Sequence, residues 1–307
     1  MKAWFLKLHR WVALLFALPL LVVIGTGLVL SFEPMVVAGG MRGKPIDAAR
    51  IEQLLAQYDP QGKARAISVR NYDNALAIGE RRDTGLVVDI ASGQVVKDDS
   101  ALFNLMIKAR RLHQTMMLDL GWLVIASTYA TLVLALLGVL LGWPRLRNTL
   151  AGWHKGAAWF LLPLLVLSPL TGLGVAHRIT FAAPPGAELP ATTLKLTEAV
   201  RAVGQKHDLS GLIWIRVRDG RMLTRLLEDG EFKVYAVTRE GTVATQRNWP
   251  RLMHEGHWGG VVGSLINVVI SLAMLGLLVT GTLIWSRRKL RRRTSRHRSS
   301  ALAGQSG

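Results

Sequence analysis

The chain has 307 residues, no cysteine, a formal net charge of +18 and a mean hydropathy of +0.29, and half of its residues are hydrophobic. The lack of cysteine excludes disulfides, iron–sulfur ligation, thiol chemistry and covalent attachment of a c-type haem. The sequence contains neither a complete dinucleotide-binding fingerprint nor a Walker A motif, so nothing indicates a site for NAD, flavin or ATP.

Four apolar runs, at residues 11–32, 120–143, 156–176 and 261–285, are each about 20 residues or longer. Runs of this length cross a bilayer core of roughly 30 Å, so the sequence predicts an integral membrane protein with four spans. The first run is longer than the core of a cleaved signal peptide, and we therefore expect it to remain as an anchor.

The distribution of charge predicts the orientation of the spans. Residues 1–10, the loop "PRLRNTLAGWHK" and the tail "SRRKLRRRTSRHR" carry 14 Lys or Arg and no acidic residue, whereas residues 33–112 and 177–253 carry 24 basic and 18 acidic residues. Because positive charge is retained on the cytoplasmic side, both termini are expected in the cytoplasm of a bacterium, with the chain in the inner membrane. The positive charge is then a topology signal and does not indicate binding to nucleic acid.

The predicted domains follow from the spans. They are a first span (1–32), a periplasmic module (33–112), a second span (113–143), a cytoplasmic loop (144–155), a third span (156–176), a second periplasmic module (177–253), a fourth span (254–286) and a basic cytoplasmic tail (287–307). Each module reads as a helix, "PIDAARIEQLLAQY" or "LKLTEAVRAVGQKH", followed by a small antiparallel sheet.

The two halves of the chain repeat one pattern. "LHRWVALLFALPLLVVIGTGL" at 8–28 returns as "WHKGAAWFLLPLLVLSPLTGL" at 153–173, and both copies have Thr-Gly-Leu seventeen to nineteen residues after the histidine. A histidine also ends each module, in "RLHQTMM" and "RLMHEG". Each half has two spans, so the halves keep one orientation and should be related by a pseudo-twofold axis along the membrane normal.

The order LHRW, module, LH, WHK, module, MHEG resembles the PepSY-associated transmembrane family over nearly the whole chain, up to about residue 288. The resemblance implies a membrane all-α four-helix bundle with an internal repeat and two small α+β, PepSY-like periplasmic modules. Members of the family include iron-regulated inner-membrane proteins, some of which are b-type haem ferric-siderophore reductases. The resemblance therefore implies an oxidoreductase that transfers electrons to a siderophore-bound iron.

The histidines at span ends are the candidate haem ligands. The pseudo-twofold axis places His9 opposite His154 on the inner side and His113 opposite His254 on the outer side. Facing imidazoles on neighbouring helices suit the axial ligation of a b haem, so two pairs predict two haems. The other interpretation of each single histidine is an ordinary polar residue at the membrane interface. His177 and His257 are alternative ligands for the outer haem.

Two glycines belong to the same prediction. Gly27 and Gly172 each lie 18 residues after a histidine, His9 or His154, and thus on the same helix face, five turns away. They leave space for a flat macrocycle on the outer side, although small residues at helix contacts explain them equally well.

Three functions remain to be compared. The first is a haem-dependent reductase that passes electrons from the cytoplasmic side to a ferric siderophore or another Fe(III) chelate, with membrane quinol, reduced flavin or a separate reductase as donor. The second is a non-redox protein whose periplasmic modules bind or regulate a partner protein. The third, transport of the chelate, is disfavoured because the spans contain almost no charged residues that would mark a path.

Overall fold

The computed structural model describes residues 2–41, 46–80, 85–144, 147–182 and 194–303, with side chains up to residue 291. The chain forms two compact units. We call the first the helical unit, made of Met1–Val29, Lys108–Ala176 and Val268–Gly307, and the second the sheet unit, made of Leu30–Ile107 and His177–Asn267. Arg145 and Leu146, in the predicted cytoplasmic loop, lie outside the described residues.

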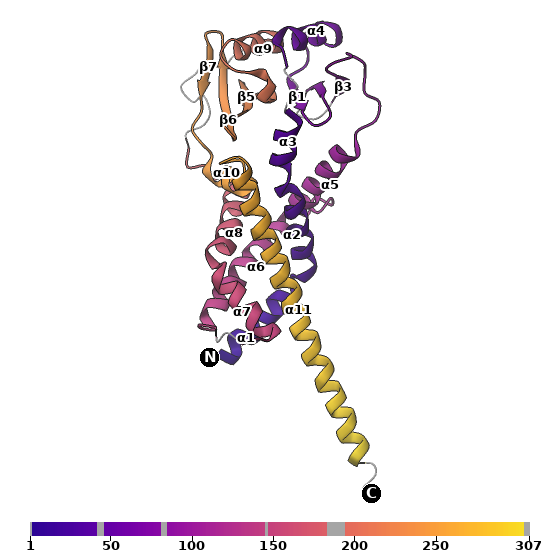
Figure 1. The fold of residues 1–307 in the computed structure, drawn as a ribbon, viewed down its shortest axis with the longest axis vertical. Helices are drawn as coiled ribbons and strands as arrows, with labels where there is room; N and C mark the ends of the chain where they lie inside the picture. Colours follow the sequence, from indigo (N-terminus) through magenta and orange to yellow (C-terminus); the bar gives the residue numbers. More distant parts are fainter. Residues whose placement is uncertain (1, 42–45, 81–84, 145–146, 183–193, 304–307) are drawn as a thin grey trace. The chain divides into compact units, whose positions relative to one another are not determined.

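The helical unit is built from α1 (Lys2–Leu15), most of α2 (Ala17–Ser31), the end of α5 (Ala101–Thr115), α6 (Gly121–Leu140), α7 (Leu150–Phe160), α8 (Leu162–Ala176) and most of α11 (Val261–Ala303) (Figure 1). Helix α6 packs against α1, α7 and α8. Among the described residues, three stretches are long and apolar enough to cross a membrane, at Ala17–Met41, Gly121–Leu140 and Val261–Arg291, and α7 with α8 makes a fourth if the bent pair is one span. The prediction of a multi-pass membrane protein is therefore confirmed.

The repeat is visible in two helix breaks. Helix α1 is separated from α2 at Phe16, and α7 from α8 at Leu161, where the two axes differ by 63°. A proline follows each break closely, Pro19 in α2 and Pro163 in α8, and a proline ring removes the N–H that would bond to the previous turn. Each break lies seven residues after the histidine of its copy, so the position of the break belongs to the repeated pattern.

The described residues of the sheet unit form one seven-stranded antiparallel sheet in the order β3-β2-β1-β4-β5-β6-β7. The first module supplies β1 (Ala66–Arg70), β2 (Ala75–Gly79) and β3 (Leu86–Asp89), and the second supplies β4 (Leu212–Arg218), β5 (Arg221–Glu228), β6 (Glu231–Thr238) and β7 (Gly241–Ala244). Tight Asp-Gly turns with positive φ, at 219–220 and 229–230, join β4 to β5 and β5 to β6.

Two helices cover one face of this sheet. Helix α4 (Ala48–Tyr58) begins at Asp47, whose carboxylate accepts a hydrogen bond from the N–H of Ala49 at 3.2 Å. It packs against α9 (Leu196–Gly204), and the apolar stripes of both helices bury the face that carries Ile67, Ile215 and Leu226. A smaller cluster on Trp214, Phe232 and Val37 of α3 (Glu33–Met41) buries the other face.

The predicted helix and strands of each module are present, but the modules do not form separate sheets. Strand β1 pairs with β4, with Ala66 opposite Arg216 and Ser68 opposite Trp214. This pairing joins the inner edge of each half and removes two exposed strand edges, which would otherwise present unpaired backbone groups.

Candidate functional site

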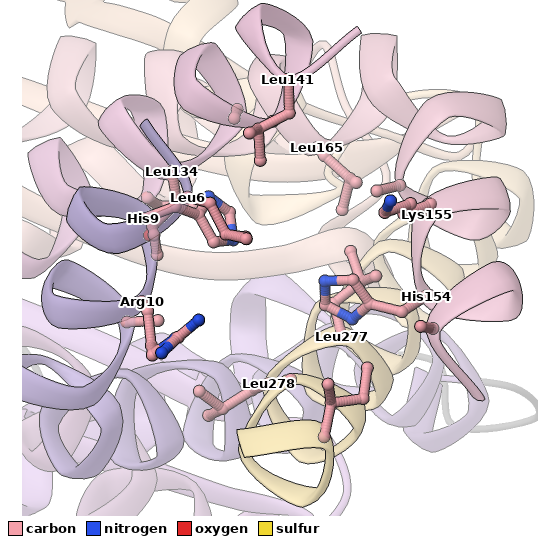
Figure 2. A pocket seen from close by; sticks show the side chains of 18 of the residues that line it. Leu6, His9, Arg10, Leu134, Leu141, His154, Lys155, Leu165, Leu277 and Leu278 are labelled. Atoms are coloured by element: carbon pink, nitrogen blue, oxygen red, sulfur yellow. The ribbon is translucent and has the colours of Figure 1, made fainter. Parts of the chain in front are cut away.

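A cavity of about 290 Å³ opens in the helical unit, comparable with the smaller ligand pockets of proteins. Most of its lining is apolar and comes from α1, α6, α7, α8 and α11. His9 and His154 both line it, and Figure 2 shows their rings projecting into the same space from α1 and α7. The structure thus brings together the two histidines that the repeat predicts as an inner pair.

The imidazole of His9 has a buried nitrogen whose hydrogen-bonding capacity is not satisfied by the described residues. Its Nδ1 atom is buried and has no hydrogen-bond partner among the described residues. Such an atom in an apolar lining costs free energy unless a ligand, a metal or an ordered water satisfies it. The cavity therefore has the composition of a binding site for a group that interacts with imidazole nitrogen.

In the part of the chain that the structure describes, three cationic residues line the same cavity: Arg10 of α1, Lys155 of α7 and Arg288 of α11. The apolar walls, two imidazoles and basic groups together suit a flat apolar molecule that carries anionic groups. A b haem, with its macrocycle, its iron and its two carboxylates, has this combination of properties.

His154 is held by α11. Its Nδ1 atom lies 2.8 Å from the hydroxyl oxygen of Thr280, and a Cβ built on Gly281 would stand 3.4 Å from its Cε1 atom. The ring therefore rests on a threonine that bonds it and on a glycine that leaves room for it.

His113 is held in the same way, at the end of α5. Its Nδ1 atom lies 3.0 Å from the carbonyl oxygen of Val23 and 3.2 Å from the hydroxyl oxygen of Thr26, both on α2. A Cβ on Gly27 would stand 3.3 Å from Cε1 of His113. The space that Gly27 leaves thus accommodates this imidazole, which is one of the two predicted outer ligands.

The family model for the PepSY-associated TM region matches residues 6–288. The chain belongs to the PepSY-associated transmembrane family. No curated protein matches it. As a member of the PepSY-associated transmembrane family it is a membrane protein, and the match runs from α1 to α11, so it includes the lining of the cavity.

The other candidate residues of this PepSY-associated protein lie in the sheet unit, apart from Gly172, which is in α8. His254 lies in the last turn of α10 (Trp249–Glu255), where its carbonyl oxygen accepts a hydrogen bond from Asn267 at 2.9 Å. His177 follows α8 and is exposed. Since the two units are described separately, the pairing of His113 with His254, and the roles of Gly27 and Gly172 beside a macrocycle, stay predictions.

His257 is buried in a charged cluster of the sheet unit. Its Nδ1 atom lies 2.7 Å from a guanidinium nitrogen of Arg225 and 2.8 Å from a carboxylate oxygen of Glu255, and its ring packs on Phe232. Its Nδ1 atom therefore already has polar contacts within this unit, and its role as an alternative outer ligand stays a prediction.

A second polar cluster lies farther along the sheet. The carboxylate of Glu228 contacts Nδ1 of His207 at 2.6 Å and accepts a hydrogen bond from the hydroxyl of Tyr235. Burial acts to raise the pKa of Glu228, but the hydrogen bonds from Tyr235 and His207 outweigh it, and the pKa lies below its ordinary value. Burial and the neighbouring Glu228 carboxylate raise the pKa of Tyr235. The cluster joins the segment after α9 to β5 and β6.

The residues that the sequence did not reveal are the partners of the histidines: Thr26, Thr280 and Gly281. A signal for them exists, because within the predicted spans Thr-Gly occurs at 26–27, at 171–172 and again at 280–281. The pair at 280–281 lies outside the repeated segment that contains the other two. Its role as a partner of His154 follows only from the contact between α7 and α11.

Proposed function

We propose that the protein is an inner-membrane, b-type dihaem oxidoreductase that passes electrons from the cytoplasmic side to a periplasmic Fe(III) chelate, such as a ferric siderophore. Reduction converts Fe(III) to Fe(II), which the chelate holds more weakly, so the iron is released. The observation that carries the proposal is the shared cavity of His9 and His154, which occurs in a chain of the PepSY-associated family.

In the inner site, His9 and His154 would hold the iron, and the basic side chains of Arg10, Lys155 and Arg288 would pair with the haem carboxylates. The leucines of the lining, among them Leu134, Leu165 and Leu277, exclude water and lower the local dielectric constant (Figure 2). A b haem bound there supplies one-electron transfer, while the protein contributes ligands, orientation and insulation.

The outer site is proposed on His113 and His254, with His177 and His257 as the alternatives to be tested. The chelate would be reduced at the periplasmic side, one electron for each Fe(III). The candidate electron donors are membrane quinol, free reduced flavin and a separate reductase. Each of them can be added to the purified protein and tested for reduction of the haem.

The test is a reduced-minus-oxidised visible spectrum of the purified protein, with a pyridine haemochromogen assay to count haem per chain. We expect two b haems in the wild type, and one fewer in His9→Ala and in His154→Ala, both inserted normally. His297→Ala, in the basic tail, is the matched control and should keep both haems. A wild-type protein without haem, prepared from haem-replete cells, would contradict the proposal and would favour the binding of a partner protein by the sheet unit.

A second step tests the activity. The dihaem protein is reduced with dithionite under anaerobic conditions, freed of excess dithionite, and mixed with a ferric siderophore in the presence of a chromogenic Fe(II) chelator. Reoxidation of the haem together with formation of the Fe(II) complex is expected. Haem that remains reduced with every ferric chelate supplied would contradict the reductase activity while leaving the haem assignment intact.

A further inference from the structure

Two Thr-Gly pairs receive two histidines of the helical unit in one geometry. Thr280 and Gly281 contact His154, and Thr26 and Gly27 contact His113. In both cases the threonine oxygen lies within hydrogen-bond distance of Nδ1, at 2.8 and 3.2 Å, and the position of a glycine Cβ lies 3.4 and 3.3 Å from Cε1. We call each Thr-Gly pair a histidine seat.

The hydrogen bonds of Thr280 determine which nitrogen of His154 carries the proton. The Thr280 hydroxyl oxygen lies 2.7 Å from the carbonyl oxygen of Gly276 and 3.3 Å from that of Leu277. Carbonyl oxygens only accept, so the single hydroxyl hydrogen is donated along the helix, and the Thr280 oxygen must accept from His154. Nδ1 of His154 therefore carries a proton, and a neutral ring has its lone pair on Nε2.

The same reasoning applies to His113. The hydroxyl of Thr26 lies 2.6 Å from the carbonyl oxygen of Val22, to which it donates. Nδ1 of His113 then faces two acceptors, the Thr26 oxygen at 3.2 Å and the Val23 carbonyl oxygen at 3.0 Å. The hydrogen bonds of both histidine seats therefore place the ring proton on Nδ1.

We propose that the seats are positioning devices: each holds its histidine as the Nδ1–H tautomer. At His154 this leaves the lone pair of Nε2 for a metal, and the Thr280 hydroxyl strengthens His154 as a ligand. The tautomer follows from the hydrogen bonds, whereas its use in iron ligation rests on the proposed haem function. A hydrogen bond donated by the remote ring nitrogen raises the basicity of the ligating nitrogen, as in other metal sites.

The two inner histidines, His9 and His154, differ in the hydrogen bonding of Nδ1. Nδ1 of His9 has no hydrogen-bond partner among the described residues, whereas Nδ1 of His154 has Thr280. Removing the Thr280 hydroxyl therefore changes one of the two proposed ligands and leaves the other as it is.

The first experiment measures the tautomer in the haem-free, full-length protein. Histidine is labelled with ¹⁵N, the nitrogen shifts are recorded by NMR, and the resonances of His154 are assigned by their loss in His154→Gln. A protonated Nδ1 with an unprotonated Nε2 is expected, and a proton on Nε2 would overturn the proposal. This measurement does not require haem, so it decides the seat even if the proposed function fails.

The second experiment compares variants of the haem-loaded protein. Thr280→Val should retain haem roughly tenfold more weakly and raise the midpoint potential of one haem, because a less basic ligand stabilises Fe(III) less. Thr280→Ser, which restores the hydroxyl, should return both values towards wild type. The control is Thr128→Val in α6, whose hydroxyl bonds to the Val124 carbonyl at 2.8 Å. Unchanged affinity and potential in Thr280→Val, or an equal change in Thr128→Val, would overturn the proposal and leave the haem assignment standing.

Discussion

Gly27 of α2 leaves the space that the imidazole of His113 occupies, because a Cβ on the glycine would stand 3.3 Å from Cε1 and 3.7 Å from Nδ1 of the ring. The absence of a side chain at Gly27 therefore has a packing function in the helical unit. The repeat predicts both Gly27 and His113 for the outer haem, from separate parts of the sequence.

Replacing Gly27 by alanine should displace the ring of His113 by a few tenths of an ångström and destabilise the haem-free protein by about 1 kcal/mol, at the low end for an overpacked site. The measurement is thermal unfolding of the detergent-solubilised protein. Gly25→Ala is the matched control, because no atom lies within 4 Å of a Cβ at that position. Equal melting temperatures for Gly27→Ala and Gly25→Ala would contradict the packing role.

Local patterns predicted much of the helical unit. The apolar runs overlap candidate membrane spans. The repeated prolines follow helix breaks, and the repeated histidines, His9 and His154, line one cavity. The apolar run at 11–32 and the first candidate span, Ala17–Met41, overlap without coinciding, because apolar residues continue after Glu33 in helical conformation.

Long-range contacts were not predictable in the same way. The seat of His154 joins residues 126 positions apart, and the pairing of β1 with β4 joins strands from different halves of the chain. The Thr-Gly pair at 280–281 is visible in the sequence but does not record which histidine it contacts, and the local pattern of Ala66 does not record its pairing with Arg216. These contacts depend on which helix faces and strand edges meet, and a single sequence does not record that information.

The pairing of β1 with β4 can be tested by cross-linking, because the chain has no cysteine of its own. Ala66 lies opposite Arg216, and directly opposed residues of antiparallel strands have Cα atoms about 4.5–5.5 Å apart, within the range of a disulfide. Ala66→Cys with Arg216→Cys should form a disulfide under mild oxidation, detected as one linked peptide pair by mass spectrometry. Ala66→Cys with Arg218→Cys, one position farther on the same face, should react far less. Equal cross-linking of both pairs would contradict the observed register.

Arg70 of β1 is a buried cation with two partners near the start of α5. Its guanidinium lies 3.4 Å from the centre of the Phe103 ring and 2.6 Å from Asp99, and only 6% of its side chain is exposed. Arg70→Met keeps the aliphatic stem and removes the charge, and we expect it to destabilise the protein by about 2 kcal/mol.

Asp99→Asn should cost less, about 1 kcal/mol, because 43% of the Asp99 side chain is exposed and water screens the pair. Asp98→Asn, at an exposed neighbouring position, serves as the control and should have no measurable effect. Urea unfolding of the three variants in one detergent gives the comparison. A larger loss in Asp99→Asn than in Arg70→Met would show that the ion pair, and not the contact with Phe103, holds this segment.

The Glu228 cluster predicts how the sheet unit responds to acid. Because hydrogen bonds from Tyr235 and His207 hold the pKa of Glu228 below the ordinary value of 4.5, the folded state binds this proton less readily than the unfolded state. The stability that Glu228 contributes is complete above pH 4.5 and is lost as the pH falls through the folded-state value. The protection of β5 and β6 against hydrogen exchange, measured relative to the intrinsic exchange rate at each pH, should therefore fall as the pH drops below 4.5.

The variant Glu228→Gln removes the titrating carboxyl and should make the protection of β5 and β6 lower at neutral pH but flatter towards acid. Glu80→Gln, an exposed carboxyl of the same sheet unit, is the control and should keep the wild-type profile. The expected loss for Glu228→Gln at pH 7 is about 1–2 kcal/mol, since two charge-assisted hydrogen bonds become neutral ones. If Glu228→Gln and Glu80→Gln gave the same slope of protection against pH, the acid response would have to arise from other carboxyl groups.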